Sequence, residues 1–401
     1  MANHTITAAG FRAGSAAAGI KSSRGPDVGV IVGDVRCSAA AVFTSNRFCG
    51  APVTVGREHV RDGRLRGIVV NSGCSNVATG QRGIRDARRM CRHLGRRIGA
   101  PPEDILPAST GVIGRFLPMD RVLRGIDLAV EDLSDSAEAG HRFARAILTT
   151  DTRSKEAFRR VRLGRTTATI AGCCKGSGMI APNLATMLAF ITTDAVITPS
   201  ALRQALREAV ERSFNRVTVD ECQSTSDTVV ALANGRSGGA AVTGRSASTY
   251  RRFVSALTEV CEDLAYQIAA DGEGATRVIE VLVRGAASPA EAHEVARAVA
   301  VSPLVRTAVH GGDPNWGRII QAIGTTRARF QPDSIRVYLC GQTVFARGRP
   351  AGSADLAAVS RGLRGKHVPL VVDLRAGRAT DRVLTCDLTK GYITINAEYH
   401  T

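Results

Sequence analysis

Residues 174–190, Cys174-Lys175-Gly176-Ser177-Gly178-Met179-Ile180-Ala181-Pro182-Asn183-Leu184-Ala185-Thr186-Met187-Leu188-Ala189-Phe190, are the stretch of this 401-residue sequence that decides the fold. Its glycines and its proline predict turns, and an apolar strand then begins abruptly with Thr186. The small Ala185 before this hydroxyl suits an N-to-O acyl shift, in which Thr186 attacks the Ala185 carbonyl. Hydrolysis of the resulting ester would make Thr186 a new N-terminus.

Such a chain end would supply a nucleophile and a general base from one residue. A free α-amine has a pKa of roughly 8, and it can accept the proton of its own hydroxyl. The structural alternative is that Thr186 is a β-branched residue that begins a buried strand. Taken alone, a threonine at the start of a strand favours the structural alternative.

Patterns along the rest of the chain predict strands that alternate with helices, so the expected class is mixed α and β. A helix is expected from Thr198-Pro199, with Pro at its first position, and another after the capping arrangement Ser288-Pro289-Ala290-Glu291. Residues 248–270 predict a long helix with Phe253 and Leu264 facing inward. Strands are expected at residues 28–32, 41–44, 67–71, 166–170, 186–193, 228–233, 278–283, 335–339 and 392–395.

The formal net charge of +17 suggests nucleic-acid binding, but the kinds of residue argue against it. Only five of the basic residues are Lys, and aromatic residues make up 4%, so few side chains could stack on bases. The Arg-rich run at 82–97 has apolar residues at helical spacing, which predicts an amphipathic helix with a solvated basic face. We therefore expect no nucleic-acid partner.

Size and apolar patterning suit a two-part protein of the cytoplasm. A chain of 401 residues is long for a single core. No apolar run reaches the roughly 18 residues that span a membrane, and the N-terminal residues lack the order of a secretory signal. The ten cysteines show no metal-binding or redox spacing. We expect most of them to be buried apolar residues, with no disulfides and no metal site.

The sequence resembles the ornithine acetyltransferase family, also called the arginine-biosynthesis bifunctional glutamate N-acetyltransferases. Lys175 to Phe190 match the family's segment, with Ala181 where His is usual and Leu184 in place of Met. Six further blocks match in order along essentially the whole chain: Ser109-Thr110-Gly111-Val112-Ile113-Gly114, Thr149-Thr150-Asp151-Thr152, Ser213-Phe214-Asn215-Arg216, Asp271-Gly272-Glu273-Gly274-Ala275-Thr276, Asp313-Pro314-Asn315-Trp316-Gly317-Arg318 and Ile395-Asn396-Ala397-Glu398-Tyr399-His400-Thr401.

The resemblance implies a self-cleaving N-terminal-nucleophile-type fold shared with certain aminopeptidases. Cleavage between Ala185 and Thr186 would give an α fragment of residues 1–185 and a β fragment of residues 186–401. Thr186 would carry the acetyl group, while Thr110 and Gly111 would form the oxyanion hole. The substrate-binding positions implied are Thr152, Lys175, Thr186, Glu273, Asn396 and Thr401.

The resemblance also implies partners: N-acetyl-L-ornithine as donor, L-glutamate as acceptor, and two copies of each fragment in the assembly. No cofactor is expected, and use of acetyl-CoA as a co-substrate stays open. The expected strand at residues 392–395 would hold the C-terminal tail over the site. Trp316 is expected to shape a pocket wall or an interface between fragments.

Departures from the family pattern leave the acceptor open. Cys74-Ser75 stand where the family has Asn-Ala, and Glu221-Cys222-Gln223 where it has Gly-Asp-Thr. Ser226 stands in place of Asn, and His400 where Arg is common. None of these departures touches the nucleophile or the oxyanion pair. One alternative is a paralogue that acts on a related amino acid in a specialised-metabolite pathway. Others are a self-cleaving amidohydrolase or aminopeptidase, in which water attacks the acetyl-enzyme, and a basic interaction protein that stays uncut.

Overall fold

The structure is a computed structural model that describes residues 6–21, 25–181, 187–244 and 247–398. It forms two compact units, each described here by itself. Unit 1 comprises Met1–Asn215 and Cys222–Ala265, and unit 2 comprises Arg216–Glu221 and Tyr266–His400. Both contain helices and a sheet, so the expected mixed α and β class is confirmed.

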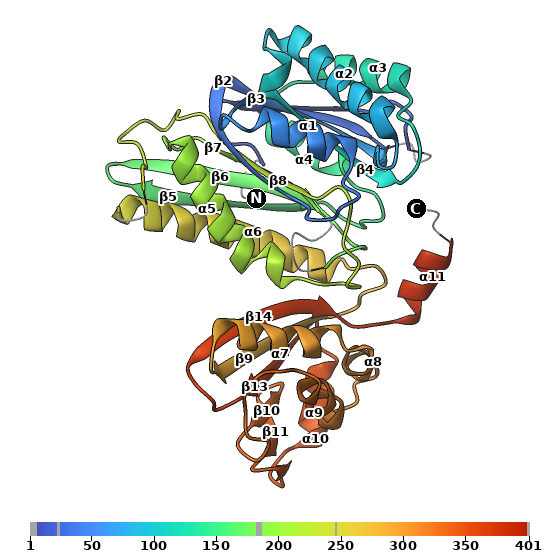
Figure 1. Ribbon diagram of the computed structural model, residues 1–401, viewed down its shortest axis with the longest axis vertical. Coiled ribbons are helices and arrows are strands. Elements are labelled where there is room, and N and C mark those ends of the chain that lie inside the picture. Colours follow the sequence, from blue (N-terminus) through green and yellow to red (C-terminus); the bar gives the residue numbers. More distant parts are fainter. Residues whose placement is uncertain (1–5, 22–24, 182–186, 245–246, 399–401) are drawn as a thin grey trace. The chain divides into compact units, whose positions relative to one another are not determined.

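Unit 1 holds the elements from β1 to most of α6 (Figure 1). Their bounds are β1 Phe11–Ala16, β2 Val28–Phe43, α1 Ala51–His59, β3 Arg64–Cys74, α2 Gly80–Ile98, β4 Ile105–Val112, α3 Met119–Glu131, α4 Ala137–Ala146, β5 Lys155–Leu163, β6 Thr166–Lys175, β7 Leu188–Thr193, α5 Pro199–Arg212, β8 Thr228–Ala233 and α6 Ser248–Ala270. Two 3-10 turns lie at Pro102–Asp104 and Phe214–Arg216.

The unit 1 sheet has eight strands in the order β4-β3-β2-β8-β7-β6-β5, with β1 paired to β2. The 16-residue β2 joins two half-sheets, because its first part pairs with β1 and β3 and its last part with β8. Its register breaks between Val32 and Cys37, and such irregularities bend a strand. One apolar core contains Phe11 and Ile31 from the first half-sheet and Phe190 and Val230 from the second, so the two halves pack face to face.

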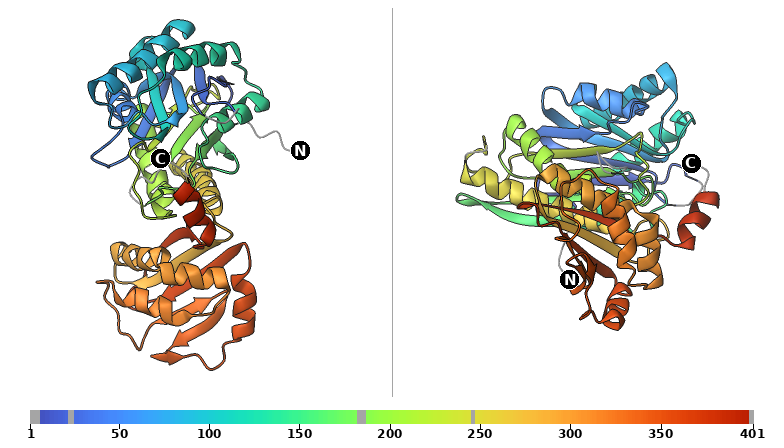
Figure 2. Two further views of the ribbon diagram at one scale, coloured as in Figure 1. Left: turned by 90° about the vertical axis from the view of Figure 1, so that its right-hand side faces the viewer. Right: turned by 60° about the horizontal axis from the view of Figure 1, so that its bottom comes forward.

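Helices cover the two outer faces of this sandwich (Figures 1 and 2). Helices α1, α2 and α3 pack on the first half-sheet through a core that includes Met90 and Ile126. Helix α5 packs on β2, and the Cys174 thiol in β6 donates to the Leu264 carbonyl in α6. The result is a four-layer α/β/β/α arrangement in which both strand layers are buried.

Several sequence predictions hold in detail. Strand β8 spans residues 228–233 and helix α6 spans 248–270, as predicted, and Phe253 and Leu264 are fully buried. The Thr198 side chain caps α5 by accepting from the Ala201 N–H. Two predicted strands, 28–32 and 41–44, are parts of the single long β2.

Unit 2 packs helices against a six-stranded sheet in the order β12-β11-β10-β13-β9-β14. Its elements are β9 Val278–Ala286, α7 Pro289–Val301, α8 Pro303–Gly311, α9 Trp316–Gly324, β10 Arg336–Leu339, β11 Gln342–Ala346, β12 Arg349–Pro350, α10 Leu356–Leu363, β13 His367–Asp373, β14 Ala379–Cys386 and α11 Lys390–Glu398. Ser288 caps α7, as predicted, by accepting from the Glu291 N–H. Trp316 begins α9, and its ring lies 5.4 Å from that of Phe345, so it packs on the core of this unit.

The predicted strand at residues 392–395 is wrong, because these residues lie inside helix α11. The run Tyr-Ile-Thr-Ile has high strand propensity, but a strand needs a neighbour to pair with, and propensity yields to context. The Thr389 hydroxyl instead accepts from the Gly391 N–H at 3.0 Å, which satisfies a donor where the helix begins.

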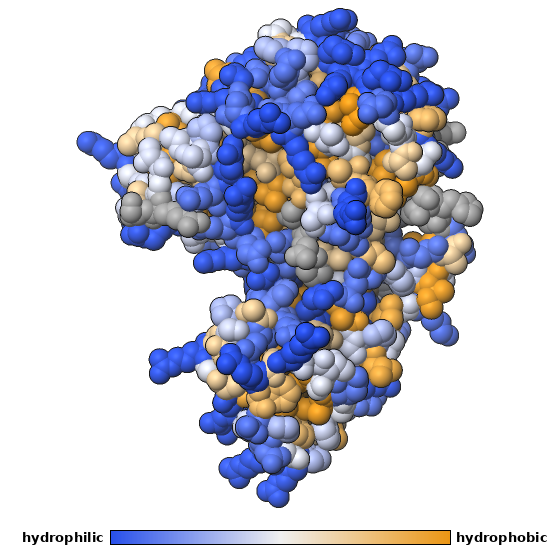
Figure 3. All heavy atoms as spheres, in the orientation of Figure 1, coloured by the Kyte–Doolittle hydropathy of each residue, from blue (hydrophilic) through white to orange (hydrophobic). Residues whose placement is uncertain are grey.

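The face visible in Figure 3 carries mainly hydrophilic residues with scattered apolar ones. Most of the cysteines are buried, as expected: Cys37, Cys74, Cys91, Cys173, Cys174, Cys261 and Cys386. Within the described ranges, no helix combines the length and apolar character that crossing a bilayer requires.

Candidate active site

The expected oxyanion pair lies at the end of β4. Strands β3 and β4 run parallel there, with Ser72 opposite Thr110 and Gly73 opposite Gly111. The Thr110 side chain is nearly buried, and no hydrogen bond of its hydroxyl is found among the described residues. Gly111 has a φ of 125°, and a Cβ added to it would come within 2.4 Å of the Gly73 carbonyl carbon. The close packing of Gly111 on β3 therefore fixes the backbone at this strand end.

Lys21 connects this strand end to a second group of charges. A Cβ built at Gly73 would lie 2.7 Å from the Lys21 Cγ, so the lysine stem passes directly beside the β3–β4 end. Its ammonium donates to the Leu148 carbonyl at 3.1 Å. Burial lowers the pKa of Lys21, the charges of Asp27 and Asp151 raise it, and that of Lys175 lowers it.

Asp151 is the buried centre of this second group. It accepts from the Lys155 ammonium at 2.7 Å and from the Gly176 N–H at 2.6 Å, and its side chain is fully buried. Burial alone would raise the pKa of Asp151, but the charges of Lys175 and Lys155 and these hydrogen bonds lower it to about 2. The carboxylate thus stays charged and ties residues 149–152 to the end of β6.

Of the two lysines at Asp151, Lys175 makes the looser contact. Its Nζ lies 3.9 Å from the carboxylate, beyond hydrogen-bond reach, whereas Lys155 Nζ makes the close contact. Lys175 is 4% exposed, and a poorly solvated ammonium favours an anionic partner. A substrate carboxylate would fit this chemistry.

Asp227 lies beside the start of β7. Its Oδ1 accepts from the Met187 N–H at 2.9 Å, and the Thr228 N–H donates to the Met187 carbonyl at 3.0 Å. The β8 segment therefore holds the residue that directly follows Thr186. Ala185 and Thr186 themselves, like Thr401, lie outside the described residues.

Unit 2 brings together two other expected substrate-binding residues. The Asn396 side chain in α11 donates to the Glu273 carboxylate at 2.8 Å. The Thr389 hydroxyl donates to the Gly274 carbonyl at 2.7 Å, so the beginning of α11 is fixed to the turn that carries Glu273. Residues 390–398 therefore form a helix that contacts this turn, where the sequence predicts a strand at 392–395.

The Glu273 turn is anchored at its other end by Asp387. This buried carboxylate accepts from the Thr276 N–H at 2.7 Å and the Thr276 hydroxyl at 2.6 Å. The side chain of His310 also contacts it, at 2.9 Å. The pKa of Asp387 is lowered: burial raises it, but the bonds from Thr276, His310 and Arg277 outweigh that effect.

Sequence reasoning missed several residues that organise these groups: Lys21, Asp151, Asp227 and Asp387. Asp151 stands inside a matched block, and its position four residues before Lys155 was a usable signal for an ion pair. Asp227 and Asp387 carry no local signal, since their partners lie 40 and 111 residues away. Thr152, which the sequence analysis did select, is exposed.

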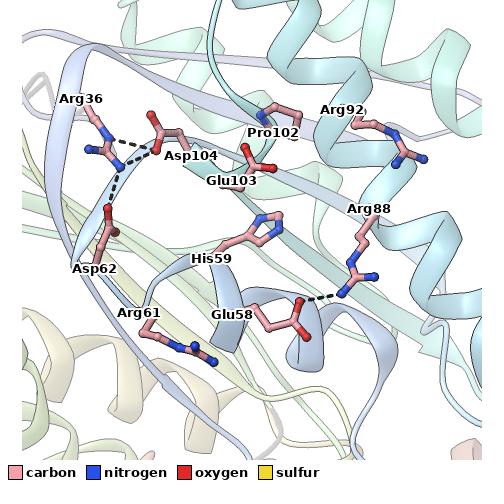
Figure 4. Close-up of a pocket in the computed structure, with 10 residues that line it drawn as sticks. All are labelled: Arg36, Glu58, His59, Arg61, Asp62, Arg88, Arg92, Pro102, Glu103 and Asp104. Atoms are coloured by element: carbon pink, nitrogen blue, oxygen red, sulfur yellow. Dashed lines mark hydrogen bonds and ion pairs between the residues drawn. The ribbon is translucent and has the colours of Figure 1, made fainter.

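A cavity of about 590 Å³ in unit 1 contains none of the expected site residues (Figure 4). Arg36 bridges Asp62 and Asp104 on one side of it, and Arg88 pairs with Glu58 on the other. Its charges largely neutralise one another. In the part of the chain that the structure describes, no group of three or more His, Cys, Asp or Glu side chains is arranged to hold a metal ion.

Comparison with known proteins gives consistent matches. The model of the ArgJ family matches residues 12–401. The chain is 46% identical to the arginine biosynthesis bifunctional protein ArgJ of Symbiobacterium thermophilum, covering 100% of this chain and 99% of that one. It is 44% identical to the protein of the same name from Dehalococcoides mccartyi, covering 98% and 96%.

A solved structure also matches. The crystal structure of the arginine biosynthesis bifunctional protein ArgJ from Bacillus halodurans is 40% identical in sequence, with a TM-score of 0.52. The match covers 53% of this chain and 100% of that chain.

Proposed function

This chain belongs to the ArgJ family, and from that premise we propose that it transfers acetyl from N-acetyl-L-ornithine to L-glutamate in arginine biosynthesis. The observation that carries the proposal is the family match over residues 12–401, which spans all the residues assigned a role. The names of the curated relatives support the pathway.

The first step is self-cleavage. The Thr186 hydroxyl attacks the Ala185 carbonyl, the peptide C–N bond breaks, and the proton from the hydroxyl ends on the departing nitrogen. Water then hydrolyses the ester, which leaves a carboxylate at Ala185 and a free amine and hydroxyl at Thr186. The solved relative supports this step, since its whole chain corresponds to just over half of this one, as residues 186–401 do.

The second step is a double displacement. The Thr186 hydroxyl, deprotonated by its own amine, attacks the acetyl carbonyl of the donor, and the ornithine amine leaves with that proton. The glutamate amine then attacks the acetyl ester, and the Thr186 oxygen recovers a proton as it leaves. Both tetrahedral intermediates place an oxyanion between the Thr110 hydroxyl and the Gly111 N–H.

Charged and polar side chains hold the substrates. Lys175 pairs with the α-carboxylate, and Glu273, oriented by Asn396, accepts from the amine. Thr152 and Thr401 complete the contacts. No cofactor takes part, and acetyl-CoA is a candidate second donor for glutamate. We expect the enzyme to act in the cytoplasm as two copies of each fragment.

The test compares the wild type with Thr186→Ala. We expect the wild type to run as fragments of about 185 and 216 residues on a denaturing gel, and to form N-acetylglutamate from N-acetylornithine and glutamate. Thr186→Ala should give one uncut band and no transfer. Thr167→Ala, which removes an exposed threonine at the other end of β6, is the matched control and should be cut and active.

Acceptor choice is tested with the same protein. A panel of amino acids replaces glutamate, because the departures at residues 74–75 and 221–223 fall outside the nucleophile and oxyanion pair. Transfer to glutamate without release of free acetate supports the proposal. Acetate release that ignores the acceptor would identify a hydrolase, and preference for another amino acid would identify a specialised-metabolite paralogue. A Thr186→Ala protein that is cut and active would refute the assignment.

A further inference from the structure

Lys21 lies beside the proposed oxyanion hole and is held there by its backbone and its stem. Its backbone N–H donates to the buried carboxylate of Asp27 at 3.1 Å, and that carboxylate also accepts from two other backbone N–H groups of the same turn. The stem passes Gly73, where an added Cβ would lie 2.7 Å from the Lys21 Cγ. Because Gly73 is paired with Gly111, the lysine is fixed next to the strand end where the acyl group is expected to react.

The ammonium of Lys21 makes one hydrogen bond within the described part of the chain. It donates to the Leu148 carbonyl at 3.1 Å. An ammonium carries three N–H donors, so the other two can serve water or a ligand. The residue is partly exposed, whereas Lys155 is fully buried and Lys175 is 4% exposed. Lys21 is therefore the most accessible cation of these three.

Cations outnumber carboxylates in the group to which Lys21 belongs. Asp151 accepts from the Lys155 ammonium at 2.7 Å, and the Lys175 ammonium lies 3.9 Å from its other oxygen. The pKa of Lys21 is lowered, first by burial and also by the charge of Lys175, although the charges of Asp27 and Asp151 raise it. Three lysines and two carboxylates leave one net positive charge. A poorly solvated group with an excess of cations favours an anionic ligand.

The separation of Lys21 and Lys175 is compatible with a dicarboxylate ligand. Lys175 Nζ lies 3.9 Å from Asp151 Oδ2, which accepts from the Thr149 N–H at 3.2 Å. The carbonyl that precedes this N–H, that of Leu148, accepts from Lys21 at 3.1 Å, so the two ammonium nitrogens are at most roughly 13 Å apart. The carboxyl carbons of glutamate are roughly 5 Å apart when the chain is extended. With a hydrogen bond of about 2.8 Å at each end, glutamate reaches over roughly 12 Å.

We propose that Lys21 is a specificity-determining residue whose ammonium binds the side-chain carboxylate of the acceptor, L-glutamate, while Lys175 pairs with the α-carboxylate. This inference rests on the proposed function and deepens it, because it names the group that selects the acceptor. The side chain of N-acetyl-L-ornithine ends in an ammonium, so the donor gains nothing from this cation. A site that hydrogen-bonds one substrate group discriminates strongly against analogues that lack it.

The test measures acceptor choice in Lys21→Met, which keeps an unbranched stem beside Gly73 and removes the charge. Glutamate is compared with glutamine, which has nearly the same shape but no side-chain carboxylate. We expect the ratio of kcat/KM for glutamate to kcat/KM for glutamine to fall by about 10- to 100-fold, the usual size for a hydrogen bond between charged groups. The KM for N-acetylornithine should stay close to the wild-type value.

Lys366→Met is the matched control, since Lys366 is an exposed lysine of unit 2, and its acceptor ratio should equal that of the wild type. An unchanged ratio in Lys21→Met would overturn the inference. So would equal losses with glutamate and glutamine together with a raised KM for N-acetylornithine, because Lys21 would then only maintain the shape of the site.

If Lys21→Met does not fold, labelling of the wild type decides. After reaction with a limiting amount of an amine-selective acylating reagent, peptide mass spectrometry should show that glutamate protects Lys21 and that glutamine at the same concentration does not. Lys366 should be labelled equally in both samples, and equal labelling of Lys21 would overturn the inference. A wild type that forms no N-acetylglutamate would count against the proposed function. A wild type that forms it with Lys21 left unprotected would count against Lys21 alone.

Discussion

Gly111 lies where the surrounding backbone leaves no room for a side chain. An added Cβ would meet the Gly73 carbonyl carbon at 2.4 Å and the Cys74 nitrogen at 2.7 Å, and neither backbone atom can move independently. We expect Gly111→Ala to displace the proposed oxyanion donor and lower kcat by about 10²- to 10³-fold. Gly114→Ala is the control: its φ is also positive, at 81°, but an added Cβ has no atom within 4 Å. Equal kcat losses in both variants would contradict this explanation.

Asp151 makes a prediction about acid stability. The pKa of this carboxyl is lowered to about 2 in the folded protein, so its contribution to stability is complete above pH 3.8 and is lost as the pH falls towards 2. Asp151→Asn should lower the unfolding free energy by about 3–5 kcal/mol near neutral pH, since it removes the carboxylate charge that faces the fully buried Lys155 ammonium at 2.7 Å.

The pH dependence of unfolding tests this prediction. Wild-type Tm should fall more steeply than that of Asp151→Asn between pH 4 and pH 2.5. Asp62→Asn, which breaks an exposed ion pair with Arg36, should keep the wild-type slope. A parallel fall in wild type and Asp151→Asn would mean that the carboxyl does not titrate as described.

At the scale of elements, helix α11 depends on Thr389. Its hydroxyl donates to the Gly274 carbonyl and accepts from the Gly391 N–H. Thr389→Ala should release the helix from the Glu273 turn and raise the KM for substrate several-fold, with a stability loss of about 1–2 kcal/mol for the two bonds. Steady-state kinetics and proteolysis of the C-terminal tail measure both effects. Thr198→Ala, which removes a cap of similar worth from α5, should change stability with KM unaffected.

The sequence predicts some of these elements correctly and others wrongly. Strand β8 and helix α6 could be predicted because apolar periodicity and local caps depend only on residues that are close together in the sequence. Helix α11 was mistaken for a strand because nothing in four consecutive residues tells whether a neighbouring strand exists. The roles of Lys21 and Asp227 arise from contacts with distant segments, which a pattern along the chain does not contain.

For the whole molecule, the proposed cut falls between two paired strands. Strands β6 and β7 are antiparallel neighbours in register from Ile170↔Thr193 to Lys175↔Leu188, and β8 of the second fragment pairs with β2 of the first. We therefore expect the fragments to remain together after cleavage. Native mass spectrometry should find both in equal numbers, and only denaturant should separate them. Free fragments in native buffer would contradict this expectation.

Strand β2 runs through both half-sheets without interruption. Because the two half-sheets share the continuous backbone of β2, local unfolding of one half-sheet also disturbs the other. Amide protons of Val30 and Val42, twelve residues apart and paired with β1 and β8 respectively, should then exchange with deuterium at a common rate. The two half-sheets would then fluctuate together, and the side chains at their common edge would keep a constant separation during thermal motion.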